Sequence, residues 1–236
     1  MGAGRAGPGG AGEGYAPPWS TRTARTTGVL YLTMALAGVP AFLLLRPLLF
    51  SPGDPGATLS AVVQHEGLAR LAVVLELGLV VTQSLTALWW WRLFRGVDPF
   101  AAAATAVFGL VNAVAVLVSA AFLATAVRLA GGGDAGPVHL AFTASDALWG
   151  VGAVFFGLWL VPMGVCVLRA RWRPGPLGHL LVAGGAGYVL SVVLAQVLPG
   201  AAALSGALTV PATVAEFAVI AHLLVLGGRP GRPGRR

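Results

Sequence analysis

Six long apolar stretches that are almost free of charged residues determine the class of this protein. Of the 236 residues, 57% are hydrophobic and only 10% are charged. A water-soluble domain of this size could not bury so much apolar surface, so most of the chain must have lipid as its solvent. Because backbone polar groups in lipid must be paired within the protein, the stretches predict helices. The expected fold is all-α, a polytopic transmembrane helical bundle.

The apolar stretches place six spans along the chain. A helix needs about 20 apolar residues to cross the hydrocarbon core, and we expect spans at about 28–50, 68–91, 100–127, 140–168, 177–198 and 203–226. The six-helix transmembrane domain then covers residues 28–227. Residues 1–27 are rich in Gly, Ala and Pro without an apolar period, which predicts a disordered cytoplasmic segment. Residues 228–236 are predicted to form a basic cytoplasmic tail.

The arginines predict the orientation of these spans. All fifteen basic residues are Arg, and three of them, Arg46, Arg70 and Arg128, fall outside or near the outer ends of the spans. The other twelve fall on the opposite side: Arg5, Arg22, Arg25, Arg92, Arg95, Arg169, Arg171, Arg173, Arg229, Arg232, Arg235 and Arg236. By the positive-inside rule both termini are cytoplasmic. An even number of spans requires the same agreement between the two ends.

The basic charge therefore reflects membrane topology, and we expect no nucleic-acid partner. The expected partner is the lipid bilayer itself. The abundance of Ala, Gly, Pro and Arg is typical of a GC-rich bacterial genome. We therefore expect a multi-pass protein of the bacterial cytoplasmic (inner) membrane.

A few ionisable residues interrupt the predicted spans. At membrane depth such groups are costly, so they face the bundle interior and find partners. The second span carries Arg70 and Glu76, and Gln83 follows seven residues after Glu76 on the same helical face. The fourth span enters the membrane from the same side as the second, and Asp146 lies in it at a depth similar to that of Glu76. The two carboxylates are therefore expected at similar depth in the outer half of the bundle.

Asn112 lies in the third span, and Glu216 lies in the sixth, near the bilayer centre. The candidate polar intramembrane site therefore comprises Arg70, Glu76, Gln83, Asn112, Asp146 and Glu216. Two interpretations stay open. In the first, polar contacts only join helices, at about 0.6 kcal/mol per contact, and Arg70 neutralises a carboxylate. In the second, three carboxylates outnumber one buried arginine and line a cavity that binds a small cation, a proton or a lipid headgroup.

Small residues predict where helices approach closely. Gly150, Gly157 and Gly164 recur every seven residues in the fourth span, and Gly184 and Gly187 lie in the fifth. Such stripes allow close helix contact in membranes. The same stripe would also suit a homo-oligomer or a partner helix, so a structural or partner-binding protein is one alternative function.

No recognisable catalytic motif is present. The sequence lacks HExxH, GxSxG, a phosphate-binding loop and a dinucleotide fingerprint, so no cofactor, metal site or catalytic residue is assigned. His65 and His139 fall in outer loops near Glu76 and Asp146, which keeps an intramembrane lipid-modifying enzyme as a second alternative. The favoured interpretation is an integral membrane protein without an assigned reaction, a small transport or sensing module.

Several short groups of residues occur in a characteristic order and spacing: Gly28 to Leu32, Gly53-Asp54, Thr58, Glu66, Arg70, Glu76, Phe155 to Leu158, Gly164, Leu177-Gly178, Ala183-Gly184, Gly187-Tyr188 and Glu216. In these features the chain resembles the uncharacterised bacterial membrane family called domain of unknown function 4386, over nearly all of Thr26 to Gly227. The resemblance implies a bundle of six or seven spans and supplies no reaction.

The chain departs from the family pattern at two positions. Gly109 stands where the resemblance implies arginine in the third span, and Ser145 stands about where it implies histidine in the fourth. If those residues are functional in relatives, this chain has lost that activity or performs a different one.

Overall fold

The computed structural model describes residues 19–172 and 175–228. Within these ranges the secondary structure is helical, with no strand among the elements. Positions 1–18 of the predicted disordered segment and positions 229–236 of the predicted basic tail lie outside the described residues. The elements are α1 (Thr21–Val39), the π-helix η1 (Pro40–Leu45), α2 (Arg46–Leu49), α3 (Pro55–Gln64), α4 (Glu66–Phe94), α5 (Pro99–Ala130), α6 (Ala135–Arg169), α7 (Pro176–Val197), the 3-10 turn η2 (Pro199–Ala201), α8 (Ala202–Ala221) and the π-helix η3 (His222–Leu226).

Six helices in the described part of the chain are long and apolar enough to cross a membrane. They span Thr21–Leu49, Glu66–Phe94, Pro99–Ala130, Ala135–Arg169, Pro176–Val197 and Ala203–Leu226. Long apolar faces, such as that of Leu43 and Leu44 in the first span, remain exposed as lipid requires. The all-α polytopic bundle predicted from the sequence is confirmed.

Side-chain caps set the start of several helices, in polar sequence outside the apolar runs. The Ser20 hydroxyl accepts a hydrogen bond from the Thr23 amide at 3.1 Å, so α1 begins at Thr21 and includes residues 21–27, which we expected to be disordered. Asp98 caps α5 in the same way, through the Ala101 amide. Such caps satisfy amides that the first helical turn leaves free, and they lengthen helices beyond their hydrophobic cores.

Two prolines break the regular geometry of the first span. The α-helix α1 ends at Val39, and Pro40 begins the π-helix η1, which leads into the short helix α2 with Pro47 at its second position. Proline removes a backbone donor and crowds the preceding turn, and π-helical turns are frequent at functional positions. The chain nevertheless stays helical, so Arg46 is carried inside the bundle at the start of α2.

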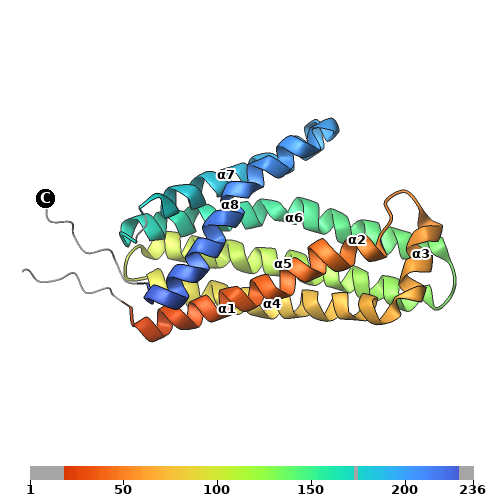
Figure 1. Cartoon of the computed structure of the whole chain (residues 1–236), viewed down its shortest axis with the longest axis horizontal. Helices are drawn as coiled ribbons and strands as arrows, with labels where there is room; N and C mark the ends of the chain where they lie inside the picture. Colours follow the sequence, from red (N-terminus) through yellow and green to blue (C-terminus); the bar gives the residue numbers. More distant parts are fainter. Residues whose placement is uncertain (1–18, 173–174, 229–236) are drawn as a thin grey trace, which may run out of the picture.

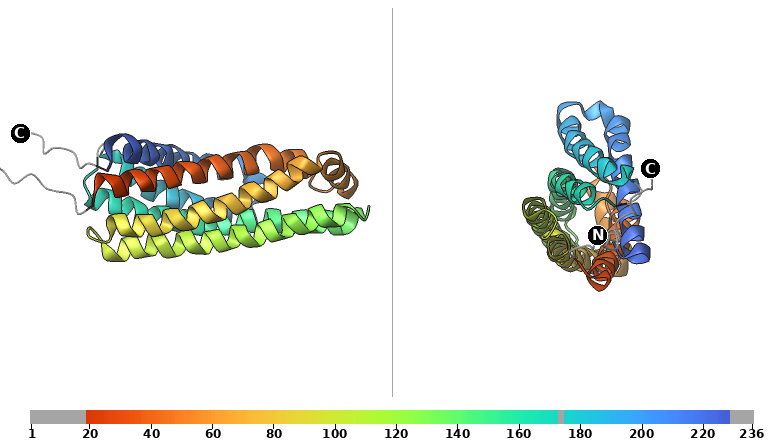
Figure 2. Two further views of the ribbon diagram at one scale, coloured as in Figure 1. Left: turned by 90° about the horizontal axis from the view of Figure 1, so that it is seen from below. Right: turned by 90° about the vertical axis from the view of Figure 1, so that its left-hand side faces the viewer.

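Figure 1 shows that α1, α4, α5 and α6 run along the long axis of the molecule, and α3 lies across one end of them. The hairpin of α7 and α8 diverges from α6 toward that same end. Figure 2 shows the long helices side by side, with the α7–α8 hairpin on one flank. The bundle is therefore closely packed at one end and splayed at the other.

The packed end joins the beginning and end of the described chain. Gly227, in a left-handed conformation at the end of η3, lies against Thr21 at the start of α1. An aromatic cluster fills the space beside them: Trp90 contacts Phe94 at 4.8 Å, and Trp172 stacks on His222 at 4.3 Å between ring centroids. Aromatic pairs of this kind add stability beyond their buried area. The first and last spans therefore meet at one end of the bundle, as an even number of spans requires.

Candidate functional site

The buried centre of the splayed half is an ion pair between Arg46 of α2 and Glu76 of α4. Arg46 Nη2 donates to Glu76 Oε1 at 2.8 Å and to the Ser145 hydroxyl at 3.0 Å. Glu76 also accepts from the Trp149 indole at 3.0 Å and from the Ser119 hydroxyl at 3.2 Å. The two charged side chains are only 8% and 3% exposed. Buried charges are tolerated only when they are paired and hydrogen-bonded, and both conditions hold here.

Asp146 lies at the edge of this cluster. Its Oδ1 is 3.5 Å from Arg46 Nη1, and its side chain is 49% exposed. Within the described residues, Arg46 Nη1 is buried without a hydrogen-bond partner. The contact is thus a Coulombic one across a short gap. Two carboxylates face one guanidinium, which leaves the cluster with a formal charge of −1.

Arg70 does not join this cluster. Its guanidinium pairs with Glu66 one turn away on α4, at 2.6 Å, and the two side chains are 67% and 59% exposed. The expectation that Arg70 neutralises an intramembrane carboxylate is therefore corrected: Arg46 does so. Arg46 was missed because it stands near the end of the first apolar stretch, where the positive-inside rule assigns an orienting role. Its position between Pro40 and Pro47 does not by itself distinguish it from an orienting arginine.

Gln83 and Asn112 form a second, separate polar contact. Asn112 Nδ2 donates to Gln83 Oε1 at 3.2 Å, and both side chains are buried between α4 and α5. In the described part of the chain, neither side chain is hydrogen-bonded to Arg46. It joins two helices as polar residues do in membranes.

Glu216 belongs to a third polar contact, separate from the ion-pair cluster and from the Gln83–Asn112 pair. It accepts a short hydrogen bond from the Tyr31 hydroxyl of α1, and no ion pair connects it to a basic side chain within residues 19–172 and 175–228. The three carboxylates of the predicted site therefore do not converge. Two share Arg46, and the third is held by tyrosine.

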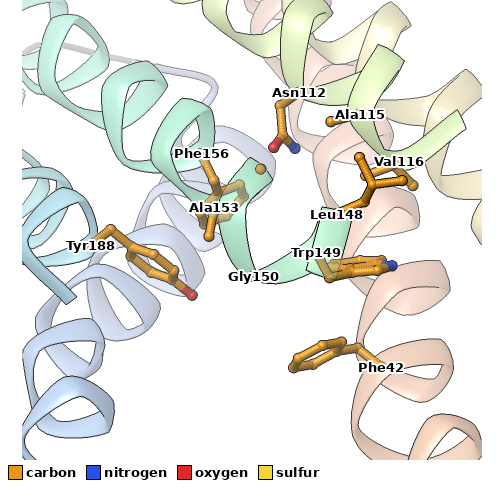
Figure 3. A pocket seen from close by; sticks show the side chains of 11 residues that line it. Phe42, Asn112, Ala115, Val116, Leu148, Trp149, Gly150, Ala153, Phe156 and Tyr188 are labelled. Atoms are coloured by element: carbon orange, nitrogen blue, oxygen red, sulfur yellow. The ribbon is translucent and has the colours of Figure 1, made fainter. Parts of the chain in front are cut away.

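A cavity of about 250 Å³ lies between η1, α5, α6 and α7, beside the ion pair. Figure 3 shows the side chains that line it, and four of them are aromatic: Phe42, Trp149, Phe156 and Tyr188. Asn112 contributes an amide to the wall, and Gly150 and Ala153 leave room on the α6 side. The cavity is therefore mainly apolar with a few polar groups, as ligand sites commonly are.

Trp149 connects the ion pair to the cavity. Its indole N–H is bonded to Glu76, its ring stacks on Phe42 at 5.0 Å, and Arg46 Cζ lies 5.9 Å from the ring centroid. On the other side of the cavity Phe156 and Tyr188 meet edge to face at 5.1 Å. The buried charges thus fix one wall of the cavity.

Small residues allow α7 to pack closely against α6 in the part of α6 that follows the cavity-lining residues. A Cβ atom at Gly157 would lie 2.7 Å from the Gly185 carbonyl oxygen, and one at Gly164 would lie 2.6 Å from the Gly178 carbonyl oxygen. These distances leave no room for a side chain. The glycine stripe of α6 is therefore occupied by a helix of the same chain.

Of the other three glycines predicted to pack helices together, two do so and one does not. Gly184 lies against the Ala212 backbone of α8, and Gly187 lies against the Leu208 carbonyl. Gly150 was expected in the same role, but nothing would approach a Cβ there within 4 Å. This expectation is corrected because α7 has already diverged from α6 at that height, so Gly150 lines the cavity instead.

The two positions that depart from the family pattern have structural roles here. Ser145 lies inside the ion-pair cluster, where its hydroxyl is 2.8 Å from that of Ser119. Gly109 lies under the Trp159 ring, with Ala87 on another side. Trp159 therefore fills the space that a larger residue at position 109 would need.

One of the two histidines considered for a metal site, His139, contacts a hydroxyl group. His139 Nδ1 is 3.1 Å from the Thr58 hydroxyl. Among the residues that the structure describes, no three His, Cys, Asp or Glu side chains gather in a way that could hold a metal ion.

The family model described as Domain of unknown function (DUF4386) matches residues 26–227. The match covers most of the chain and confirms the resemblance found in the sequence. No curated protein and no solved structure matches the chain.

Proposed function

The chain belongs to the family described as Domain of unknown function (DUF4386), and we propose that it is a small ligand-binding membrane module of the transport or sensing class. The single observation that carries this proposal is the cavity of about 250 Å³ with aromatic walls inside a multi-pass helical bundle. Cavities that combine apolar walls with a few polar groups are the usual form of small-molecule sites.

The ion pair supports this site rather than serving as the site itself. Glu76 receives donors from Arg46, Trp149 and Ser119, and its side chain is almost completely buried. A carboxylate held by so many donors is fixed in place, because each bond would have to be broken to free it. We therefore assign Glu76 and Arg46 the task of holding Trp149 against the cavity.

The shape of the bundle supports ligand entry from the splayed half. The α7–α8 hairpin diverges from α6 there (Figure 1), while the other end is closed by the aromatic cluster around Trp172. If both termini are cytoplasmic, as the arginines favour, the splayed half faces the outside of a bacterial inner membrane. A ligand would then enter from the outer leaflet or the outer aqueous phase.

The partner-binding alternative loses its main argument. The glycine stripe of α6 was its candidate surface, and Gly157 and Gly164 are covered by α7 of the same chain. A second copy or a partner helix would have to use another surface.

A cavity-filling substitution tests the proposed function. We expect Ala153→Phe, on the cavity wall, to abolish ligand retention, and Ala147→Phe, on an exposed part of the same helix, to preserve it. Native mass spectrometry of protein released from its own membrane would record the bound ligand, and melting curves against a panel of small amphiphiles would record stabilisation. A wild-type protein without bound mass or ligand-dependent stabilisation, or equal behaviour of both variants, contradicts the proposal.

A further inference from the structure

We propose that the ligand of this cavity is a small organic cation with a quaternary ammonium group. This inference rests on the proposed function, because it names the ligand class of the same cavity. It is carried by two observations, the aromatic walls and the excess of carboxylates around them.

The aromatic walls suit a cation without hydrogen-bond donors. The faces of Trp, Tyr and Phe rings carry negative potential, and several rings around one space form the common recognition site for quaternary ammonium groups. Here the rings come from three different elements, with Phe42 on η1, Trp149 and Phe156 on α6, and Tyr188 on α7. Figure 3 shows them on different sides of the space next to Gly150.

The charges near the cavity are predominantly negative. The cluster behind Trp149 contains Glu76 and Asp146 with Arg46 alone to balance them. In a medium of low dielectric constant, such an excess attracts a cation strongly.

The bond from Trp149 to Glu76 strengthens the same preference. An indole that donates its N–H to a carboxylate at 3.0 Å gains electron density in its ring. The electrostatic attraction of the ring for a cation increases accordingly. The ion pair thus positions Trp149 as one wall of the cavity, where its ring stacks on Phe42 and lies 5.9 Å from Arg46 Cζ.

An anionic ligand fits these residues poorly. Arg46 is the basic group nearest to Trp149 in the described part of the chain, and its Nη2 is bonded to Glu76 while Nη1 faces Asp146. An anion would have to displace a carboxylate to reach it. A volume of about 250 Å³ lies below the range typical of drug-sized ligands, so the cation must be small.

A pair of ligands with matched shape tests the inference on the unmodified protein. Choline and 3,3-dimethylbutan-1-ol differ mainly in the charged nitrogen, which is carbon in the alcohol. Calorimetric titration of the full chain in lipid nanodiscs should show choline binding on the order of tenfold more tightly. Equal binding of both would overturn the cation inference and leave a ligand-binding cavity in place. Binding of neither would overturn the inference, while the Ala153→Phe comparison would still decide the proposed function.

Substitutions at and away from the cavity wall test where in the molecule the preference for choline over the alcohol arises. Tyr188→Leu and Phe156→Leu should each remove most of the preference for choline over the alcohol, whereas Phe217→Leu on the exposed face of α8 should leave it unchanged. Asp146→Asn should weaken choline binding several-fold, and Glu66→Gln in the exposed pair should not. A full preference in both Tyr188→Leu and Phe156→Leu would place the cation elsewhere and contradict the assignment.

Discussion

Two arginine–glutamate pairs in this chain show how burial changes the contribution of an ion pair to stability. The pair of Arg46 with Glu76 is buried and joins the first span to the second, whereas Arg70 and Glu66 pair on the exposed surface of α4. Exposed pairs contribute about 0–1 kcal/mol. Breaking a buried pair by removing one partner costs about 3–5 kcal/mol, because the remaining charge is left uncompensated.

Glu76→Gln is therefore expected to lower the free energy of unfolding by about 3 kcal/mol. Arg46 would keep only the half-exposed Asp146 as a counter-charge, at 3.5 Å. The control Glu66→Gln makes the same chemical change on the same helix and should cost less than about 1 kcal/mol. Unfolding of both variants in mixed micelles, followed by circular dichroism, would measure the two effects. Equal effects would show that the buried pair does not stabilise the bundle.

The sequence identified part of this cluster and missed its centre. Glu76 and Asp146 stand out because ionisable groups are rare inside apolar spans, and both lie around Arg46. Arg46 itself could not be distinguished from an orienting arginine, because apolar runs do not show how far a helix continues past Pro40. Glu216 was grouped with the others by depth alone, and depth does not specify which side of the bundle a residue faces. The cavity arises from side chains of four spans and had no signal of its own in the sequence.

At the scale of elements, glycine spacing decides where α6 and α7 touch and where they separate. Gly157 and Gly164 meet the backbone of α7, whereas Gly150, one heptad earlier, has open space around it. The sequence showed one uniform stripe of three glycines. The divergence of α7 depends on the packing of the α7–α8 hairpin as a whole, which a pattern along α6 alone does not contain.

Replacing glycine by alanine at two positions of α6 should therefore affect the stability of the protein differently. Gly157→Ala should destabilise the protein by about 1–3 kcal/mol, because the added methyl group overlaps the Gly185 carbonyl. Gly150→Ala should be neutral or stabilise by up to about 1 kcal/mol through helix propensity. Thermal unfolding of both variants in the same detergent would compare them. A stable Gly157→Ala protein would mean that α6 and α7 are not in close contact.

The boundaries of the elements were the least predictable feature of the fold. The six apolar stretches predicted six spans, and each has a helix in the structure. The first and third of these helices begin before their apolar stretches, because Ser20 and Asp98 cap them in polar sequence. Hydropathy measures the part of a helix that lipid covers, and capping decides where the helix itself begins.

At the scale of the whole molecule, the first and last helices meet at the end that is closed by aromatic residues. Gly227 against Thr21 and the packing of Trp90 with Phe94 hold this end together. Six spans therefore return the chain to the side on which it started, and the arginine distribution favours the cytoplasmic side.

Reporter fusions test this topology. A fluorescent protein, which folds on the cytoplasmic side, should be active on either terminus, and alkaline phosphatase, which requires the outer side, should be inactive on both. Fusion of the same reporters to the loop between α5 and α6, at Gly132, should give the reverse result, since that loop lies at the opposite end of both helices. Opposite results at the two termini would contradict an even number of spans.

The most direct measurement for the cavity as the functional centre is a crystal structure of the chain grown from a lipid mesophase containing choline. We expect Arg46 bonded to Glu76, the Trp149 indole on the same carboxylate, and ligand density between the rings of Phe42, Phe156 and Tyr188. A bundle in which α7 closes onto α6 at Gly150, leaving no space among these rings, would contradict both the cavity and the function drawn from it.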